Sequence, residues 1–242
     1  MSEAALIDEG LPVPARGDII HMSGIRKVYD TGKVTVEALR GIDLEVSLGE
    51  MVALIGPSGS GKSTLMNLIG CLDTPTDGHY ELRGERVAGL RREQLAEIRN
   101  RRVGFVFQSF NLLPQISAYE NVEMPMLFGG LSRRKRRERV TALLERVGLQ
   151  DRMTHKPTEL SGGQMQRVAI ARAMAMEPDI LLADEPTGNL DTSSGGDIMS
   201  LFSNLWEQGC TILVITHDRA LARRAPRQVE MRDGLITSDI RS

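Results

Sequence analysis

The chain has 242 residues, of which 41% are hydrophobic, and its 30 basic and 32 acidic residues give a formal net charge of −2. This length and composition suffice for one sizeable core, and the balanced charge gives no sign of binding to nucleic acid or to a bulk membrane surface. Two cysteines are too few for a disulfide scaffold and fit a reducing compartment. No stretch reaches the roughly 18 to 20 apolar residues of a membrane span, and the N-terminus lacks a signal-peptide pattern, which predicts a cytosolic protein.

The first predicted elements follow a tail. Residues 1–16 are acidic and interrupted by prolines, which is typical of a flexible segment. From 18 to 48 the apolar positions mostly alternate, and this predicts short antiparallel strands. The apolar run at 51–55 predicts a buried strand, and a helical pattern follows it.

Strands and helices then alternate along the chain. Residues 103–107 form a strand candidate, and 117–148 are mainly helical with a break near Gly129-Gly130, so a helical insert is predicted at about 109–165. Further helices and strands are predicted at 162–176, 180–183, 193–208 and 211–215, followed by a hairpin at 227–236 that turns at Asp233-Gly234. This alternation predicts a mainly parallel α/β core within a single domain, residues 17–242.

Residues 56–63 (Gly-Pro-Ser-Gly-Ser-Gly-Lys-Ser) match the P-loop pattern G-x-x-x-x-G-K-[ST], after a strand and at the start of a helix. Glycines allow the backbone to wrap closely around a phosphate. Lys62 supplies a point charge for the β- and γ-phosphates, and the Ser63 hydroxyl can ligate Mg²⁺. The alternative is a Gly-rich turn with a solvated lysine, and the flanking strand and helix disfavour it.

Two carboxylates, Asp184 and Glu185, end the predicted strand that begins at residue 180. Beside a P-loop, Asp184 is predicted to reach Mg²⁺ through its water shell, and Glu185 to polarise the attacking water. Gln108 and His217 also follow predicted strands, where a polar side chain can meet the γ-phosphate. Taken singly, a Gln or His at such a place is more often a surface residue.

A second Gly-rich turn, Leu160-Ser161-Gly162-Gly163-Gln164, precedes a helix with Ser161 as its N-cap. A helix N-terminus of this kind can hold an anion. Alone, the turn indicates only a helix cap. One chain with two phosphate-handling loops, too short for two nucleotide domains, predicts one ATP held between two copies of the chain.

This ordered set of motifs resembles the ATP-binding-cassette (ABC) ATPases from about Asp18 to Ile236. Residues 56–63 are similar to the Walker A loop, and Ile180 to Asp184 to Walker B. Gln108 resembles the Q-loop glutamine, and residues 160–164 resemble the signature motif. Glu185 resembles the catalytic glutamate, and His217 resembles the switch histidine. Residues 189–191 resemble the D-loop. Tyr29 occupies the place of the aromatic residue that stacks on adenine.

Residues 65–73, 105–114 and 183–191 resemble more closely the MacB/LolD-type branch, which serves macrolide efflux and lipoprotein release. Met165 departs from the glutamine that many members carry after the signature. The permease segment that some members carry fused to the cassette is not expected here, since the 242 residues do not include it. The resemblance implies a P-loop NTPase core with a mainly parallel sheet, an N-terminal antiparallel β subdomain and a helical insert.

The resemblance also implies ATP and Mg²⁺ as cofactors, a head-to-tail homodimer and a set of site residues. Those implied for the nucleotide are Tyr29, Gly56, Pro57, Ser58, Gly59, Ser60, Gly61, Lys62, Ser63 and Thr64, with Ser161, Gly162, Gly163, Gln164 and Asp191. Those implied for Mg²⁺ are Ser63, Gln108 and Asp184. Those implied for catalysis are Glu185, His217 and Gln108.

The implied function is an ATPase that powers a separate membrane permease with an extracytoplasmic domain, at the cytoplasmic face of the inner membrane. An ATP-driven regulator of an envelope complex without cargo is the alternative, and a DNA-repair or translation ATPase is disfavoured because no coiled-coil insert or tandem cassette is present. The apolar positions between 112 and 128 fit either subdomain core or, as in the ABC family, the surface that receives the partner. The basic run at 133–137 fits a solvated helix face, with partner or acidic-lipid contact as the alternative.

Overall fold

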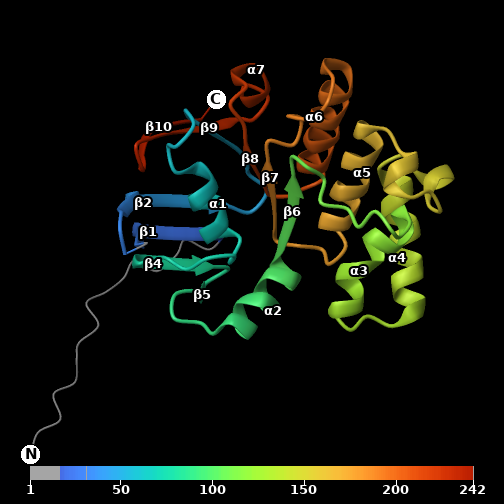
Figure 1. Cartoon of the computed structure of the whole chain (residues 1–242), viewed down its shortest axis with the longest axis horizontal. Coiled ribbons are helices and arrows are strands. Elements are labelled where there is room, and N and C mark those ends of the chain that lie inside the picture. Colours follow the sequence, from blue (N-terminus) through green and yellow to red (C-terminus); the bar gives the residue numbers. More distant parts are fainter. Residues whose placement is uncertain (1–16, 31, 242) are drawn as a thin grey trace, which may run out of the picture.

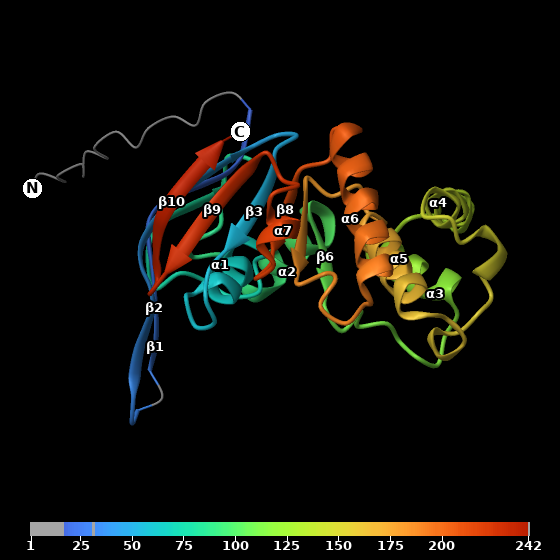
Figure 2. The ribbon, with the colours of Figure 1, turned by 90° about the horizontal axis from the view of Figure 1, so that it is seen from above.

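Two β-sheets organise residues 17–30 and 32–241, the part of the chain that the computed structural model describes. The tail predicted at 1–16 lies outside the described residues. Figures 1 and 2 show the antiparallel sheet at one end of the molecule, the helices α3, α4 and α5 at the other, and the second sheet between them. The predicted fold class, an α/β protein with an antiparallel subdomain and a helical insert, is confirmed.

The antiparallel sheet has the strand order β2-β1-β4-β5. It comprises β1 (Asp18–Asp30), β2 (Thr35–Ser47), β4 (Asp77–Leu82) and β5 (Glu85–Arg86). The strands predicted to be short are instead two strands of 13 residues, whose pairing runs from Asp18 opposite Ser47 to Asp30 opposite Thr35. Register shifts interrupt this pairing, and such bulges break the alternation that a sequence pattern relies on.

The second sheet has the order β10-β9-β3-β8-β7-β6. Its strands are β3 (Met51–Ile55), β6 (Val103–Phe107), β7 (Ile180–Asp184), β8 (Ile212–Ile215), β9 (Arg227–Arg232) and β10 (Leu235–Arg241). All pairs are parallel except the β9–β10 hairpin, so β3, β6, β7 and β8 end at one edge. The P-loop follows β3, Gln108 follows β6, Glu185 follows β7 and His217 lies after β8. These four predicted site segments therefore meet at that edge.

Seven α-helices accompany the sheets within the described residues. They are α1 (Lys62–Ile69), α2 (Arg92–Arg102), α3 (Ala118–Phe128), α4 (Arg133–Arg146), α5 (Gly162–Ala173), α6 (Thr192–Glu207) and α7 (Arg219–Ala222), with 3-10 turns at Gln150–Arg152 and Pro157–Glu159. The predicted break near Gly129-Gly130 separates α3 from α4. The boundaries 109 and 165 of the helical insert remain a prediction, and α5 continues through residue 165 without interruption.

The second sheet separates two hydrophobic cores. Along β3, Met51, Ala53 and Ile55 contribute to the core shared with α3, α4, α5 and α6, whereas Val52 and Leu54 contribute to the core shared with α1 and the antiparallel sheet. Burial on both faces explains why β3 is an uninterrupted apolar run. In the described part of the chain, every helix is too short or too polar to span a bilayer.

Candidate nucleotide-binding site

The loop between β3 and α1 folds tightly around the side chain of Lys62. Its ammonium group donates hydrogen bonds to the carbonyl oxygens of Gly56 (2.9 Å) and Pro57 (2.8 Å) and lies 3.3 Å from Ser60 Oγ. Gly56 has φ +151°, and a Cβ there would lie 2.2 Å from the backbone oxygen of Met231, so only glycine fits. The sequence pattern therefore follows from close backbone packing.

The turn of the β9–β10 hairpin fixes this loop from outside. The amide of Gly234 donates to the Ser60 carbonyl oxygen (3.1 Å), and the amide of Arg40 donates to the Gly234 carbonyl oxygen (3.0 Å). The hairpin, predicted from Asp233-Gly234 alone, thus connects β2 to the P-loop. The sequence did not predict that the hairpin contacts the P-loop, because hairpin residues carry no phosphate-binding pattern.

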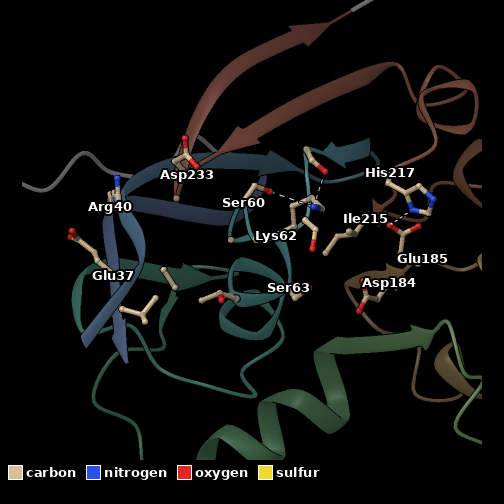
Figure 3. A pocket seen from close by; sticks show the side chains of 18 of the residues that line it. Glu37, Arg40, Ser60, Lys62, Ser63, Asp184, Glu185, Ile215, His217 and Asp233 are labelled. Atoms are coloured by element: carbon tan, nitrogen blue, oxygen red, sulfur yellow. Dashed lines mark hydrogen bonds and ion pairs between the residues drawn. The ribbon is translucent and has the colours of Figure 1, made fainter. Parts of the chain in front are cut away.

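The P-loop forms one wall of a cavity of about 720 Å³ (Figure 3). Most of the predicted site residues line it: Gly56, Ser58, Gly59, Ser60, Gly61, Lys62, Ser63, Thr64, Gln108, Asp184, Glu185 and His217. Residues that the sequence did not indicate complete the lining: Val36, Glu37, Ala38, Arg40, Ile215, Asp233 and Gly234. The P-loop side of the cavity thus combines backbone amides and the Lys62 ammonium with the carboxylates of Asp184 and Glu185.

The charges in this cavity suit a divalent cation. Burial lowers the pKa of Lys62, although Glu185 and Asp184 oppose that shift. Burial raises the pKa of the Asp184 carboxyl, Glu185 raises it further, and Lys62 lowers it. Two carboxylates beside one ammonium leave negative charge at the end of β7, which a cation would neutralise. The oxygen atoms of Ser63, Asp184 and Gln108 are the hard donors that Mg²⁺ prefers, so these residues fit the predicted metal.

Glu185 and His217 form a pair at the end of the neighbouring strands β7 and β8. Glu185 Oε1 lies 2.8 Å from His217 Nδ1, as the dashed line in Figure 3 shows. The Glu185 side chain is 19% exposed and that of His217 is 76% exposed. Glu185 has the left-handed φ of +45°, and its amide donates to the Ile215 carbonyl oxygen (2.9 Å). The backbone of Glu185 is therefore fixed, and its carboxylate is oriented by an imidazole that stands at the surface.

Two side chains organise the loops around Gln108: Asn189, in the segment that resembles the D-loop, and Gln166, which the sequence did not indicate. Asn189 exchanges hydrogen bonds with Gln108: its Nδ2 donates to the Gln108 carbonyl oxygen (3.0 Å), and its Oδ1 accepts from Gln108 Nε2 (3.3 Å). Gln166, which is fully buried on α5, donates to the Pro186 carbonyl oxygen (2.7 Å) and the Phe107 carbonyl oxygen (3.4 Å). Gln166 thus connects the residue before Gln108 to the residue after Glu185.

The second Gly-rich loop lies away from this cavity in the same chain. Ser161 Oγ accepts from the amide of Gln164 (3.3 Å), so Ser161 is the N-cap that the sequence predicts. A Cβ on Gly162 would touch Leu190, and Asp191 caps α6 through the amide of Ser194 (2.9 Å). None of Ser161, Gly162, Gly163, Gln164 and Asp191 lines the P-loop cavity within the described residues. Instead of lying at the cavity, the segment 160–164 that resembles the signature motif lies beside the segment 189–191 that resembles the D-loop.

Tyr29 lies on β1, outside the lining of the same cavity. Its hydroxyl donates to Asp73 Oδ2 (2.9 Å), and the Lys27 ammonium lies 4.9 Å from its ring centroid. Burial and the Asp73 carboxylate raise the pKa of the Tyr29 hydroxyl, and contact with Thr64 opposes that shift. The contact with Thr64, which does line the cavity, brings Tyr29 close to its rim. Adenine binding by Tyr29 stays a prediction.

Comparison with known proteins identifies the family. Residues 39–188 match the ABC transporter family. An uncharacterised ABC transporter ATP-binding protein of Thermotoga maritima is 52% identical over 218 residues, covering 90% of this chain and 93% of that protein. The macrolide export ATP-binding/permease protein MacB of Brucella melitensis is 52% identical over 225 residues, covering 93% of this chain but only 35% of MacB.

A solved structure agrees in fold. The dimeric structure of the ATP-binding cassette MJ0796 in a post-hydrolysis state, bound to ADP and Pi, matches with a TM-score of 0.83 at 43% identity. The match covers 92% of this chain and 98% of that one. Together with the P-loop cavity, these similarities confirm the resemblance inferred from the motifs. The chain belongs to the ABC transporter family, as an ATP-binding cassette of the MacB/LolD branch.

Proposed function

We propose that this chain hydrolyses ATP at an interface between two copies of itself and thereby drives a separate membrane permease of the MacB/LolD type. One observation supports this most directly: the cavity holds the P-loop, Asp184, Glu185 and His217, whereas the second Gly-rich loop lies outside it. In a dimer, Ser161 and the amides that follow it would reach the nucleotide of the other copy.

The predicted site residues in the cavity have distinct roles in this reaction. The P-loop amides and Lys62 bind the phosphates. Ser63, Gln108 and Asp184 would hold Mg²⁺, which when bound neutralises charge on the β- and γ-phosphates. Glu185 orients the attacking water and accepts its proton, and His217, 2.8 Å from Glu185, keeps that carboxylate in place.

A dimer explains how hydrolysis could do mechanical work. Ser161, Gly162 and Gly163 offer a helix N-terminus, which carries the partial positive charge that attracts a phosphate. Closure would be favoured by the γ-phosphate and released after its loss, as in other ligand-biased two-state systems. The dimeric MJ0796 cassette, bound to ADP and Pi, supports this arrangement.

The membrane partner would sit at the groove beside β6. This groove, of about 580 Å³, has an apolar lining that includes Leu72, Phe105 and Phe128. Phe128 is 79% exposed, whereas Val122 and Met126 on the same helix are buried. The apolar stretch 112–128 thus supplies both subdomain core and an open apolar surface, which suits docking of a permease segment.

MacB, of whose length this chain covers 35%, is an ATP-binding/permease protein, so that cassette and permease are one protein there. We propose that this cassette works at the cytoplasmic face of the inner membrane, bound to a separate permease with an extracytoplasmic domain.

The Glu185→Gln variant tests this proposal. It should bind Mg-ATP, hydrolyse it at least about 100-fold more slowly and accumulate as a dimer, since removal of a general base costs about 10²–10⁴ in rate. Hydrolysis and molecular mass in Mg-ATP are the measurements. A variant that remains monomeric in saturating Mg-ATP would contradict the shared site. Co-purification of the permease, followed by a transport assay, separates a transporter from a regulator without cargo.

A further inference from the structure

We propose that Asn189 is a positioning residue whose side chain sets which atom of the Gln108 carboxamide faces the metal. The inference rests on the proposed function, in which Gln108 is a ligand of Mg²⁺. Asn189 lies in the loop between β7 and α6, and 81 residues separate it from Gln108. Both side chains are exposed, so no packing contact alone fixes their orientation.

The orientation of the Asn189 amide follows from simple hydrogen-bond chemistry. A backbone carbonyl oxygen only accepts hydrogen bonds, so the Asn189 atom that lies 3.0 Å from the Gln108 carbonyl must be the NH₂ nitrogen. Its other terminal atom, Oδ1, is then an acceptor. The atom of Gln108 that lies 3.3 Å from Oδ1 must therefore be the donor Nε2.

Among the described residues, this arrangement leaves Gln108 Oε1 as the free end of the carboxamide. Gln108 lines the cavity together with Ser63 and Asp184, the two other predicted metal ligands. A cation is attracted by a carboxamide oxygen and repelled by the NH₂ group, which has no acceptor site. Without Asn189, the carboxamide could turn by 180° and present the wrong atom.

The backbone on both sides of the pair is fixed, so Asn189 can act as a stable reference. The amide of Gly188 donates to the Glu185 carbonyl oxygen (2.9 Å), which closes the turn after β7. Gln166 connects the ends of β6 and β7 through the carbonyl oxygens of Phe107 and Pro186. Gly188 also leaves room for the pair, because a Cβ there would lie 2.6 Å from Gln108 Nε2.

The test is a set of equilibrium binding titrations with a fluorescent ATP analogue, in Mg²⁺ and in EDTA. Asn189→Leu keeps the size of the side chain and removes both hydrogen bonds. It should weaken binding in Mg²⁺ about 10-fold, in the range found when a residue that orients a metal ligand is lost, and leave binding in EDTA unchanged. Gly188→Ala, whose Cβ would displace Gln108, should weaken Mg²⁺-dependent binding in the same direction.

Two comparisons make the result specific. In a Gln108→Ala background, Asn189→Leu should cause no further loss, because Asn189 acts through Gln108. Asn204→Leu, at an exposed position on α6, is the matched control and should leave both affinities unchanged.

The outcomes separate this inference from the proposed function. If Gln108→Ala weakens Mg²⁺-dependent binding but Asn189→Leu and Gly188→Ala do not, Asn189 does not orient Gln108, and the metal role of Gln108 stands. If Asn189→Leu weakens binding equally in EDTA, its effect is not on the metal and the inference is overturned. If Gln108→Ala has no Mg²⁺-dependent effect, the metal role of Gln108 is wrong, and the inference is overturned with it.

Discussion

His217 Nδ1 lies 2.8 Å from Glu185 Oε1, and this contact joins the ends of two adjacent parallel strands, β7 and β8. Glu185 is fixed by its left-handed backbone and its amide hydrogen bond, whereas His217 is exposed. The backbone of Glu185 is thus fixed, and the imidazole is the accessible member of the pair. This asymmetry suits a base that remains in place and a histidine that can also approach the nucleotide.

His217→Ala should therefore impair hydrolysis more than binding. Glu185 would lose its hydrogen-bond partner and its orientation, which should lower kcat by about 100-fold while the affinity for Mg-ATP changes little. Steady-state kinetics beside equilibrium nucleotide binding measure the two effects. His155→Ala, in a histidine remote from the P-loop cavity, is the control. A kcat within twofold of wild type would show that His217 has no part in the reaction.

Gly56→Ala should destabilise the fold much more than an ordinary glycine substitution in a left-handed turn. Its new Cβ would collide with the Met231 carbonyl oxygen at 2.2 Å, and backbone cannot move aside cheaply. We expect a loss of about 2–4 kcal/mol in the free energy of unfolding. Gly84→Ala is the matched control, since Gly84 has φ +73° with open space around it and should lose only about 1 kcal/mol. Equal losses in urea denaturation would contradict the collision.

Gln166→Met should weaken both stability and catalysis. The substitution leaves the Pro186 carbonyl oxygen buried without its donor, which costs about 1–3 kcal/mol, and leaves the Phe107 carbonyl oxygen only the Phe110 amide as donor. Because those residues flank Gln108 and Glu185, kcat should also fall. Urea denaturation and steady-state kinetics report the two effects. Gln150→Met, at an exposed position, is the control, and a stability equal to that of wild type would show that these hydrogen bonds contribute nothing.

Asp239→Asn should change how stability depends on pH. Arg227, whose side chain is 5% exposed, donates to both Asp239 oxygens (2.8 and 2.7 Å) and holds the pKa of that carboxyl below its ordinary value of 3.8. A lowered carboxyl pKa adds stability above pH 3.8, and this stability is lost as the pH falls through the folded-state value.

The variant should therefore lose about 1–2 kcal/mol at pH 7, a figure that allows for the partial exposure of Asp239. The difference from wild type should shrink as the pH falls below 3.8. Urea denaturation as a function of pH measures it, with Asp151→Asn at an exposed site as control. A constant difference across this range would show that the Arg227–Asp239 pair is not the source.

The sequence by itself determined the parts of this protein whose signals are local. The P-loop, the carboxylates after β7 and the N-cap Ser161 lie within short motifs, because glycine turns, buried strands and helix caps depend on a few adjacent residues. The interiors of the parallel strands were equally clear, since burial on both faces makes them continuously apolar. The polar helix α2 was not predicted, because it buries only Leu95 and Ile98.

Only the tertiary structure decided which residues meet across long separations. The pairing of Asn189 with Gln108, the bridge from Gln166 to two strand ends and the contact of Gly234 with the P-loop join residues that are far apart in the chain. Side chains such as asparagine and glutamine serve equally well at a surface, so their type gives no sign of a partner. The register of the sheet fixes these contacts, because it places the ends of β3, β6, β7 and β8 side by side.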